Sequence, residues 1–332
     1  MNKRDFLQTG AGAGIALAAP NLIAAAPALA NEPAKAAAAA SAPPQEQDRY
    51  PYSAIVDRPP LRWPNGARVA VWVIPNIEHF LFDRPSSSII QATTNFVPDV
   101  LNYSWRDYGV RVGIWRLMEA MEKYGIKGTV ALNSDVCRHY PRIIEAGNKL
   151  GWEWMGHGTN NSTVINKQPE PEERQIIKGV VETITQATGK APRGWLSPAL
   201  SESHRTLDIL AENGIRYIAN WVNDDQPYRM RVKSGSMLSV PYSVEINDYV
   251  AFLEQGQTGV QFAQTIRDQF DVLYEDGART GRVMAICLHP FLISQPHRSK
   301  HFAEALAYIT SHKDIWLATG GEITDWYEKT YK

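Results

Sequence analysis

From position 68 onward, short apolar runs alternate with longer segments in which apolar residues recur every three to four positions. Runs that are apolar throughout predict strands buried on both faces, and the three-to-four spacing predicts amphipathic helices. The predicted strands cover residues 68–75, 127–132, 152–155, 193–196, 216–219, 237–240, 283–288 and 315–318.

Helices are expected between these strands. Their apolar stripes fall within residues 114–121, 140–150, 176–184, 204–213, 262–273, 303–309 and 322–327. Repeated β-then-α units in one continuous stretch imply parallel strands, so the predicted fold is α/β, with a sheet closed or nearly closed into a barrel. An open doubly wound sheet is the alternative, but no glycine-rich phosphate loop follows the first strand.

The first 30 residues have a different pattern. Lys3 and Arg4 precede an apolar run rich in Ala and Gly, which ends in the small-x-small sequence Ala28-Leu29-Ala30. This arrangement predicts a signal peptide of the twin-arginine type, with Lys3 in place of the first arginine. Glycines and prolines interrupt the run, which argues against a permanent anchor. We expect a periplasmic or secreted chain with no stable membrane insertion after cleavage.

Residues 31–49 are rich in Ala, Pro and Gln and have no apolar periodicity, which predicts a flexible linker before one domain at residues 50–332. The full chain of 332 residues has a formal net charge of -1, so no nucleic-acid partner is expected. Ten Trp and 14 Tyr would suit a cleft for a small or sugar-like ligand as well as a core. Cys137 and Cys287 are expected to be separate buried thiols, because two cysteines make no disulfide framework.

Polar residues follow nearly every predicted strand. In parallel barrels the functional groups gather just past the carboxyl ends of the strands, and packing alone explains so many polar strand ends poorly. The candidates at these positions are Asn76, Glu78, His79, Asn133, Asp135, His157, Asn160, Asn161, Arg193, Trp195, Asp224, Asp225 and His289.

The order of these motifs resembles that of a known family. The sequences NxEH at 76–79, GHGxxN at 156–161, RGW at 193–195, NDD at 223–225 and LHP at 288–290 resemble the NodB-like polysaccharide deacetylases, carbohydrate esterase family four. The resemblance covers about residues 50–331. It implies a distorted (β/α) barrel of about seven parallel strands and hydrolysis of C–N bonds other than peptide bonds, typically the N-acetyl groups of sugars.

The chain departs from the usual pattern of that family, which has a catalytic Asp, a metal-binding Asp and an H-x3-H pair. Asn76 stands in place of the catalytic Asp, and an amide cannot act as a general base. Glu78 replaces the metal-binding Asp, and Asn161 replaces the second His after His157. Glu78, His157 and Asn161 would make at most a weak metal site, so we expect either no cofactor or one divalent metal.

This altered pattern resembles the branch that contains metal-independent allantoinases and related cyclic-amide hydrolases. The first expectation is therefore an enzyme that opens a small cyclic amide, ureide or imide. The alternative is an N-deacetylase of an N-acetylated polysaccharide, and a second alternative is a non-catalytic carbohydrate-binding protein. Residues 83–108 form a long insertion after the first strand, which would suit a lid or a contact in a homo-oligomer.

Amide hydrolysis requires an activated water and a proton for the leaving nitrogen. We assign water activation to Glu78, relayed through His157, and protonation of the nitrogen to His289. Arg193 would orient a substrate carbonyl, Trp195 would form an apolar wall, and Asp224 or Asp225 would fix the tautomer of His289. The full set of supporting residues is Asn76, Arg193, Trp195, Asp224, Asp225 and His297.

Overall fold

The structure is a computed structural model that describes residues 46–84, 90–93 and 95–331. The expected signal peptide and most of the expected linker lie outside the described residues, so both remain predictions. Contacts divide the chain into Met1–Glu46 and Gln47–Lys332, and the following description concerns the second unit. None of the helices described is long and apolar enough to cross a membrane.

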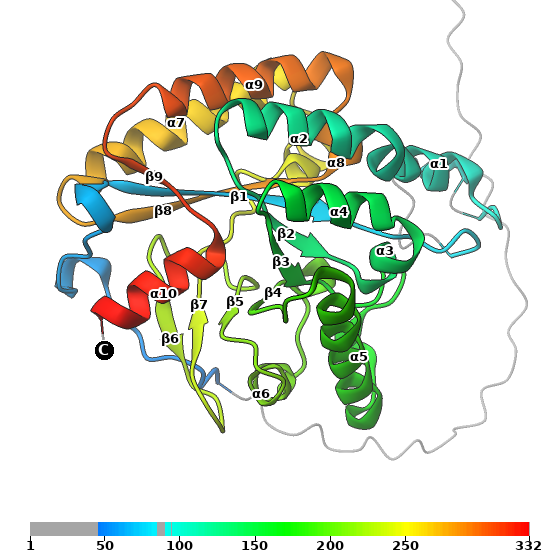
Figure 1. Ribbon diagram of the computed structural model, residues 1–332, viewed down its shortest axis with the longest axis horizontal. Helices are drawn as coiled ribbons and strands as arrows, with labels where there is room; N and C mark the ends of the chain where they lie inside the picture. Colours follow the sequence, from blue (N-terminus) through cyan, green and yellow to red (C-terminus); the bar gives the residue numbers. More distant parts are fainter. Residues whose placement is uncertain (1–45, 85–89, 94, 332) are drawn as a thin grey trace, which may run out of the picture. The chain divides into compact units, whose positions relative to one another are not determined.

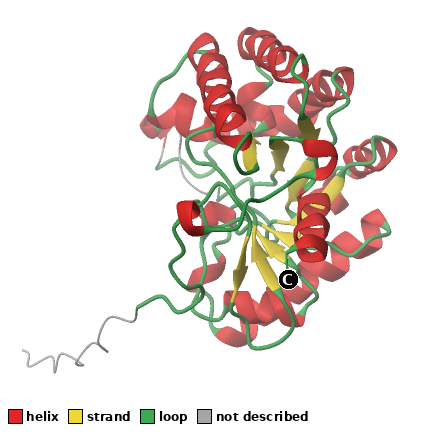
Figure 2. Ribbon diagram, turned by 90° about the vertical axis from the view of Figure 1, so that its left-hand side faces the viewer, coloured by secondary structure: helices red, strands yellow, loops and turns green. Residues whose placement is uncertain are grey.

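One curled sheet forms the centre of this unit, with helices packed around it (Figure 2). Its hydrogen-bonded order is β6-β7-β5-β4-β3-β2-β1-β8, and β9 pairs with β1. The strands are β1 (Val69–Ile77), β2 (Thr129–Leu132), β3 (Glu153–Gly156), β4 (Gly194–Trp195), β5 (Tyr217–Ile218), β6 (Tyr228–Met230), β7 (Met237–Ser239), β8 (Arg282–Leu288) and β9 (Ile315–Leu317).

The two ends of the sheet approach each other without pairing strand to strand. Loop residues connect them, because the Val283 N–H donates to the carbonyl of Asp225 and the Cys287 N–H donates to that of Ile246. All strand pairs are parallel except β6–β7. The expected distorted α/β barrel is therefore confirmed.

The antiparallel strand β6 is a departure from the all-parallel prediction. It is three residues long, and Arg229 at its centre is exposed. Three residues are too few for an apolar run or an alternation of apolar and polar residues to identify a strand.

Helices pack around the outside of the curled sheet (Figure 1). Helices α2, α7 and α9 lie together over β1 and β8, whereas α5 and α6 lie beside the β4–β5 end. The helices are α1 (Val100–Tyr108), α2 (Ile114–Lys123), α3 (Ser134–His139), α4 (Pro141–Lys149), α5 (Glu170–Thr188), α6 (Thr206–Glu212), α7 (Gly259–Gly277), α8 (Pro290–Ile293), α9 (Pro296–Thr310) and α10 (Gly320–Thr330).

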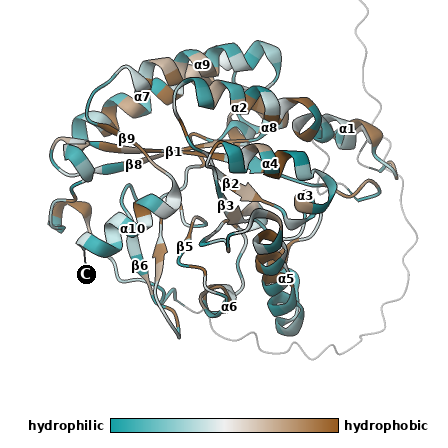
Figure 3. Ribbon diagram, viewed as in Figure 1, coloured by the Kyte–Doolittle hydropathy of each residue, from teal (hydrophilic) through white to brown (hydrophobic). Residues whose placement is uncertain are grey.

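The nine residues of β1 are all buried, and successive side chains enter different cores. Val71 and Val73 join the apolar cluster beneath the helices, whereas Trp72 and Ile74 join the cluster inside the barrel. This division follows from the two-residue period of a strand. Trp72 lies edge-on to Tyr217 there, so the interior is filled rather than hollow. Figure 3 shows the resulting apolar strands.

The helices α1 and α2 join through a π-helical turn at Gly109–Gly113. A Cβ atom on Gly113 would lie 2.2 Å from the carbonyl oxygen of Pro290, so glycine allows this backbone to rest directly on the turn after β8. Cys137 and Cys287 are both buried and free, which confirms the expectation of separate thiols.

Candidate active site

Three strands of the sheet bring the three predicted catalytic side chains together. Glu78 follows β1, His157 follows β3 and His289 follows β8. The Glu78 Oε1 atom lies 3.4 Å from His157 Nε2 and 3.6 Å from His289 Nε2. Parallel strands place their carboxyl ends at one edge, so residues separated by more than 200 positions meet there.

Asp248 holds His289 in place and was not among the residues predicted from the sequence. Its side chain is fully buried and lies 2.7 Å from His289 Nδ1. It also accepts hydrogen bonds from the backbone N–H groups of His289 and Ile293. A carboxylate only accepts, so His289 carries a proton on Nδ1 and directs Nε2 towards Glu78.

The charges in this cluster influence one another strongly. Burial alone would raise the pKa of Glu78, but the positive charge of His289, with His157 and Arg106, lowers it below its ordinary value. Burial would lower the pKa of His289, but the carboxylates of Glu78 and Asp248 raise it above its ordinary value. The site therefore favours an ionised Glu78 beside a protonated His289.

His157 presents its Nε2 atom to Glu78. Its Nδ1 atom lies 2.5 Å from the carbonyl oxygen of Leu196, so Nδ1 carries a proton that it donates to this oxygen. The Nε2 atom is buried and has no geometrically good hydrogen-bond partner among the described residues. It is thus available to a water or substrate atom placed beside Glu78.

A chain of hydrogen bonds fixes the orientation of Asn161. The backbone N–H of His79 donates to Asn133 Oδ1, so the Asn133 Nδ2 group must be the donor to Asn161 Oδ1 at 2.9 Å. Asn161 therefore directs its Nδ2 group to Glu78 Oε1, 2.5 Å away. This N–H group stabilises the carboxylate, but it cannot ligate a metal ion.

The expected weak metal site of Glu78, His157 and Asn161 does not form as a ligand set, although the three residues are adjacent. Two donors remain when Asn161 offers nitrogen, and zinc sites need at least three protein ligands. Within the ranges that the structure describes, no group of three or more His, Cys, Asp or Glu side chains is arranged to hold a metal. These residues do not fit the metal that the family resemblance implies.

The described part of the insertion at residues 83–108 covers the site from one side. Its helix α1 carries Arg106, a buried residue that lies over the ring of Phe80 and lines a small cavity with Glu78, Phe291 and others. The cavity is about 10 Å³, which is room for about one water molecule. The described part of the insertion thus has the placement of a cap.

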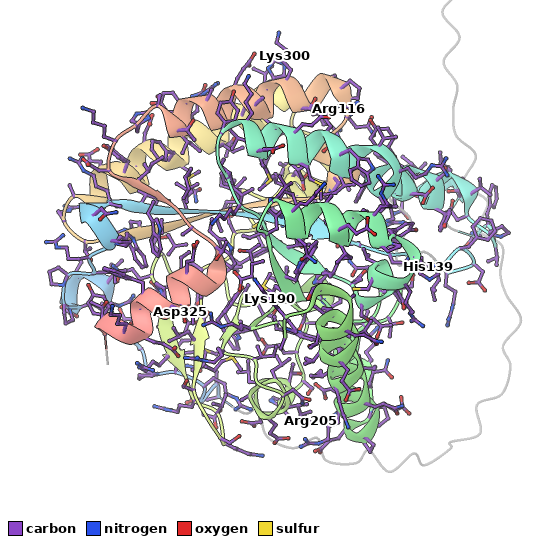
Figure 4. The ribbon with its side chains drawn as sticks, viewed as in Figure 1. Arg116, His139, Lys190, Arg205, Lys300 and Asp325 are labelled. Carbon is purple, nitrogen blue, oxygen red and sulfur yellow. The ribbon has the colours of Figure 1, made fainter. Side chains whose placement is uncertain are left out.

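The prediction for Arg193 is wrong. Arg193 precedes β4, and its carbonyl accepts the N–H of Arg216 just before β5, so it lies at the amino end of the sheet. Its guanidinium forms a two-point ion pair with Asp325, which Figure 4 labels on α10. It cannot reach a substrate at Glu78.

The predictions for Asp224 and Asp225 are wrong for the same reason. Asp224 forms a two-point ion pair with Arg58. The carbonyl of Asp225 accepts the N–H of Val283 near the start of β8, whereas His289 follows the end of that strand. At about 3.3 Å per residue the separation approaches 20 Å, so neither carboxylate orients His289.

The other supporting residues have mainly structural places. Trp195 is fully buried, packs on Gly156 and donates to Ser197, so it forms core rather than a pocket wall. His297 is exposed in the first turn of α9. Asn76 is buried beside the site and donates to the carbonyl of Leu288, which joins β1 to β8.

Comparisons with known proteins agree with this architecture. Residues 103–218 match the family model of the polysaccharide deacetylases. A Schizosaccharomyces pombe protein, provisionally assigned as a polysaccharide deacetylase, is 28% identical over 79% of this chain and 90% of its own length. The peptidoglycan deacetylase of Helicobacter pylori is 25% identical over 64% of this chain and 83% of its own length.

Solved structures share the fold. A probable polysaccharide deacetylase from Pseudomonas aeruginosa PAO1 has a TM-score of 0.75 and 26% identity, covering 85% of this chain and 99% of that one. The Puue allantoinase has a TM-score of 0.74 and 24% identity, covering 85% of this chain and 98% of that one, which shows a common fold alone. In sequence and fold the chain is thus similar to polysaccharide deacetylases, which hydrolyse amide C–N bonds, and its residues 103–218 match the model of that family.

Proposed function

We propose that this protein is an N-deacetylase of an N-acetylated sugar and that Glu78 and His289 are its acid–base pair. The observation that carries the proposal is the position of Glu78 between two histidines, one of them held by a buried aspartate. The curated relatives support deacetylation over the ring opening that the sequence pattern ranked first.

The proposed reaction uses the charges already in the site. Ionised Glu78 takes a proton from a water that also hydrogen-bonds to His157 Nε2, and the water oxygen attacks the acetyl carbonyl. Protonated His289 then gives its Nε2 proton to the departing nitrogen, so the C–N bond breaks and acetate and a free amine result. Asp248 keeps His289 oriented throughout, and no step requires a metal.

A second candidate is hydrolysis of a small cyclic amide. The specific observation in its favour is the cap formed by α1, which places Arg106 beside Glu78, because a site covered on one side suits a compact substrate better than a long polymer. A cyclic imide is also more electrophilic than an acetamide, so its hydrolysis depends less on activation of the carbonyl group by a metal ion.

Direct assays separate the two candidates. Purified protein is incubated with chitohexaose or with allantoin, with and without a chelator, and acetate release or ring opening is measured. Acetate release that the chelator leaves unchanged, and that Glu78→Gln abolishes, is the expected result. Ring opening without acetate release would favour the second candidate, and a chelator-sensitive reaction would contradict the metal-free mechanism.

A further inference from the structure

A cavity of about 690 Å³ lies away from the catalytic residues. Three segments line it: residues 50–61 before β1, residues 223–229, which lead into β6, and residues 327–331 at the end of α10. Nothing in the proposed acid–base chemistry uses this cavity.

Five tyrosines supply most of its aromatic surface. The rings of Tyr50 and Tyr228 are 4.9 Å apart, and those of Tyr327 and Tyr331 are 5.4 Å apart. Tyr52 is 92% exposed at the edge. Tyrosine offers an apolar ring face with a polar tip and has few rotatable bonds, so these rings form contact surface that costs little to order.

The polar groups between these rings are held rigidly. Arg58 makes two hydrogen bonds to Asp224, at 2.8 and 2.7 Å. Asn223 links the rings of Tyr50 and Tyr228, because it donates a hydrogen bond to the Tyr50 hydroxyl and accepts one from the Tyr228 hydroxyl. The central charges neutralise each other, which favours a neutral ligand with many hydroxyl groups over an anion.

A second cavity of about 560 Å³ continues from the first, because both are lined by Ser53, Arg58, Asn223 and Asp224. It is lined by the segment that follows β7, which includes Tyr242, and by Val283 and Ala285 of the end strand β8. The Tyr242 hydroxyl accepts from Asn76 Nδ2, two residues before Glu78. The two cavities, here called the seam groove, thus run from the tyrosines towards the catalytic end of the barrel.

We propose that the seam groove binds a neutral N-acetylated oligosaccharide. A pyranose ring has an apolar face of C–H groups and a rim of hydroxyl and amide groups, which matches the tyrosine faces and the fixed polar groups between them. The choice of sugar rests on the proposed deacetylase function. The groove itself is a binding site separate from Glu78.

Titration calorimetry with chitohexaose tests the proposal in the Glu78→Gln background, where the sugar is not consumed. Combining Tyr52→Ala with Tyr327→Ala should weaken binding about 10-fold or more, as truncation of aromatic contacts commonly does. Val56→Ala is the matched control, because Val56 is 86% exposed on the same segment but lines neither cavity. If the combined variant does not fold, binding is measured with Tyr52→Ala alone, because Tyr52 is exposed and its truncation should leave the fold intact.

Equal affinity in the tyrosine variants and the control would overturn the proposal, as would an absence of chitohexaose binding to the Glu78→Gln protein. The outcome also separates the two proposals. If the tyrosine variants lose binding while the unsubstituted protein releases no acetate from chitohexaose, the seam groove stands and the deacetylase assignment fails.

Discussion

The two ends of the barrel contain similar charged residues in opposite environments. At the carboxyl end, Glu78, His289 and Asp248 are buried and depend on one another for charge balance. At the amino end, Arg193 and Asp325 pair where their side chains are 38% and 58% exposed. Water screens the second pair much more than the first, so the buried groups influence one another's charge more strongly. Strand direction, rather than residue type, separates a reactive cluster from an ordinary surface ion pair.

Glu78→Gln is the substitution with the largest expected effect. It removes the proton acceptor while keeping the size of the side chain, so kcat should fall about 10³-fold. Steady-state kinetics measures the loss, and an unchanged circular dichroism spectrum is the control for folding. Activity within a few-fold of the unsubstituted enzyme would rule out Glu78 as the base.

Asp248→Asn tests the positioning of His289. Asparagine keeps the size of the side chain but has one acceptor oxygen instead of two and no negative charge, so kcat should fall about 10²-fold. Asp248 helps to raise the pKa of His289, and the enzyme needs His289 protonated. Removing the charge therefore lowers that pKa and moves the alkaline limb of the kcat/KM profile to lower pH. A loss of activity with an unmoved alkaline limb would indicate a merely structural role.

Arg193→Ala should have the smallest effect. It breaks only a partly exposed ion pair at the amino end, so activity should stay within about two-fold and the free energy of unfolding should change by less than about 1 kcal/mol. Kinetics and urea unfolding measure both quantities. A large rise in KM would place Arg193 back in the substrate site.

The sequence predicted the parts of this molecule that rest on long, regular patterns. Strands β1 and β8 are long and buried throughout, so their ends could be located, and with them Glu78 and His289. The position of Arg193 was misjudged because β4 is only two residues long, and no pattern in so short a strand shows that Arg193 stands before it.

Asp248 could not be identified from local pattern. It lies 41 residues before His289, at the start of a short helical segment that continues into the π-helical turn Val250–Glu254, and its importance comes from a tertiary contact. The only local signal was the pair Asn247-Asp248 just before the apolar run that starts at Tyr249. Similarly, motif reading could show that Asn161 replaces a histidine, but not which side of its amide faces Glu78. That orientation depends on Asn133, which follows a different strand.

The backbone contact between Gly113 and Pro290 sets a limit on recombination between this chain and proteins of similar sequence and fold. Segments that end before Gly109 can be exchanged between homologues as units, provided that the incoming helix supplies an equivalent of Arg106. A crossover between Gly113 and the turn after β8 would combine surfaces that were never fitted to each other, since no side chain lies between them to absorb a mismatch. Libraries of chimeric enzymes should therefore inherit α2 and β8 from the same parent.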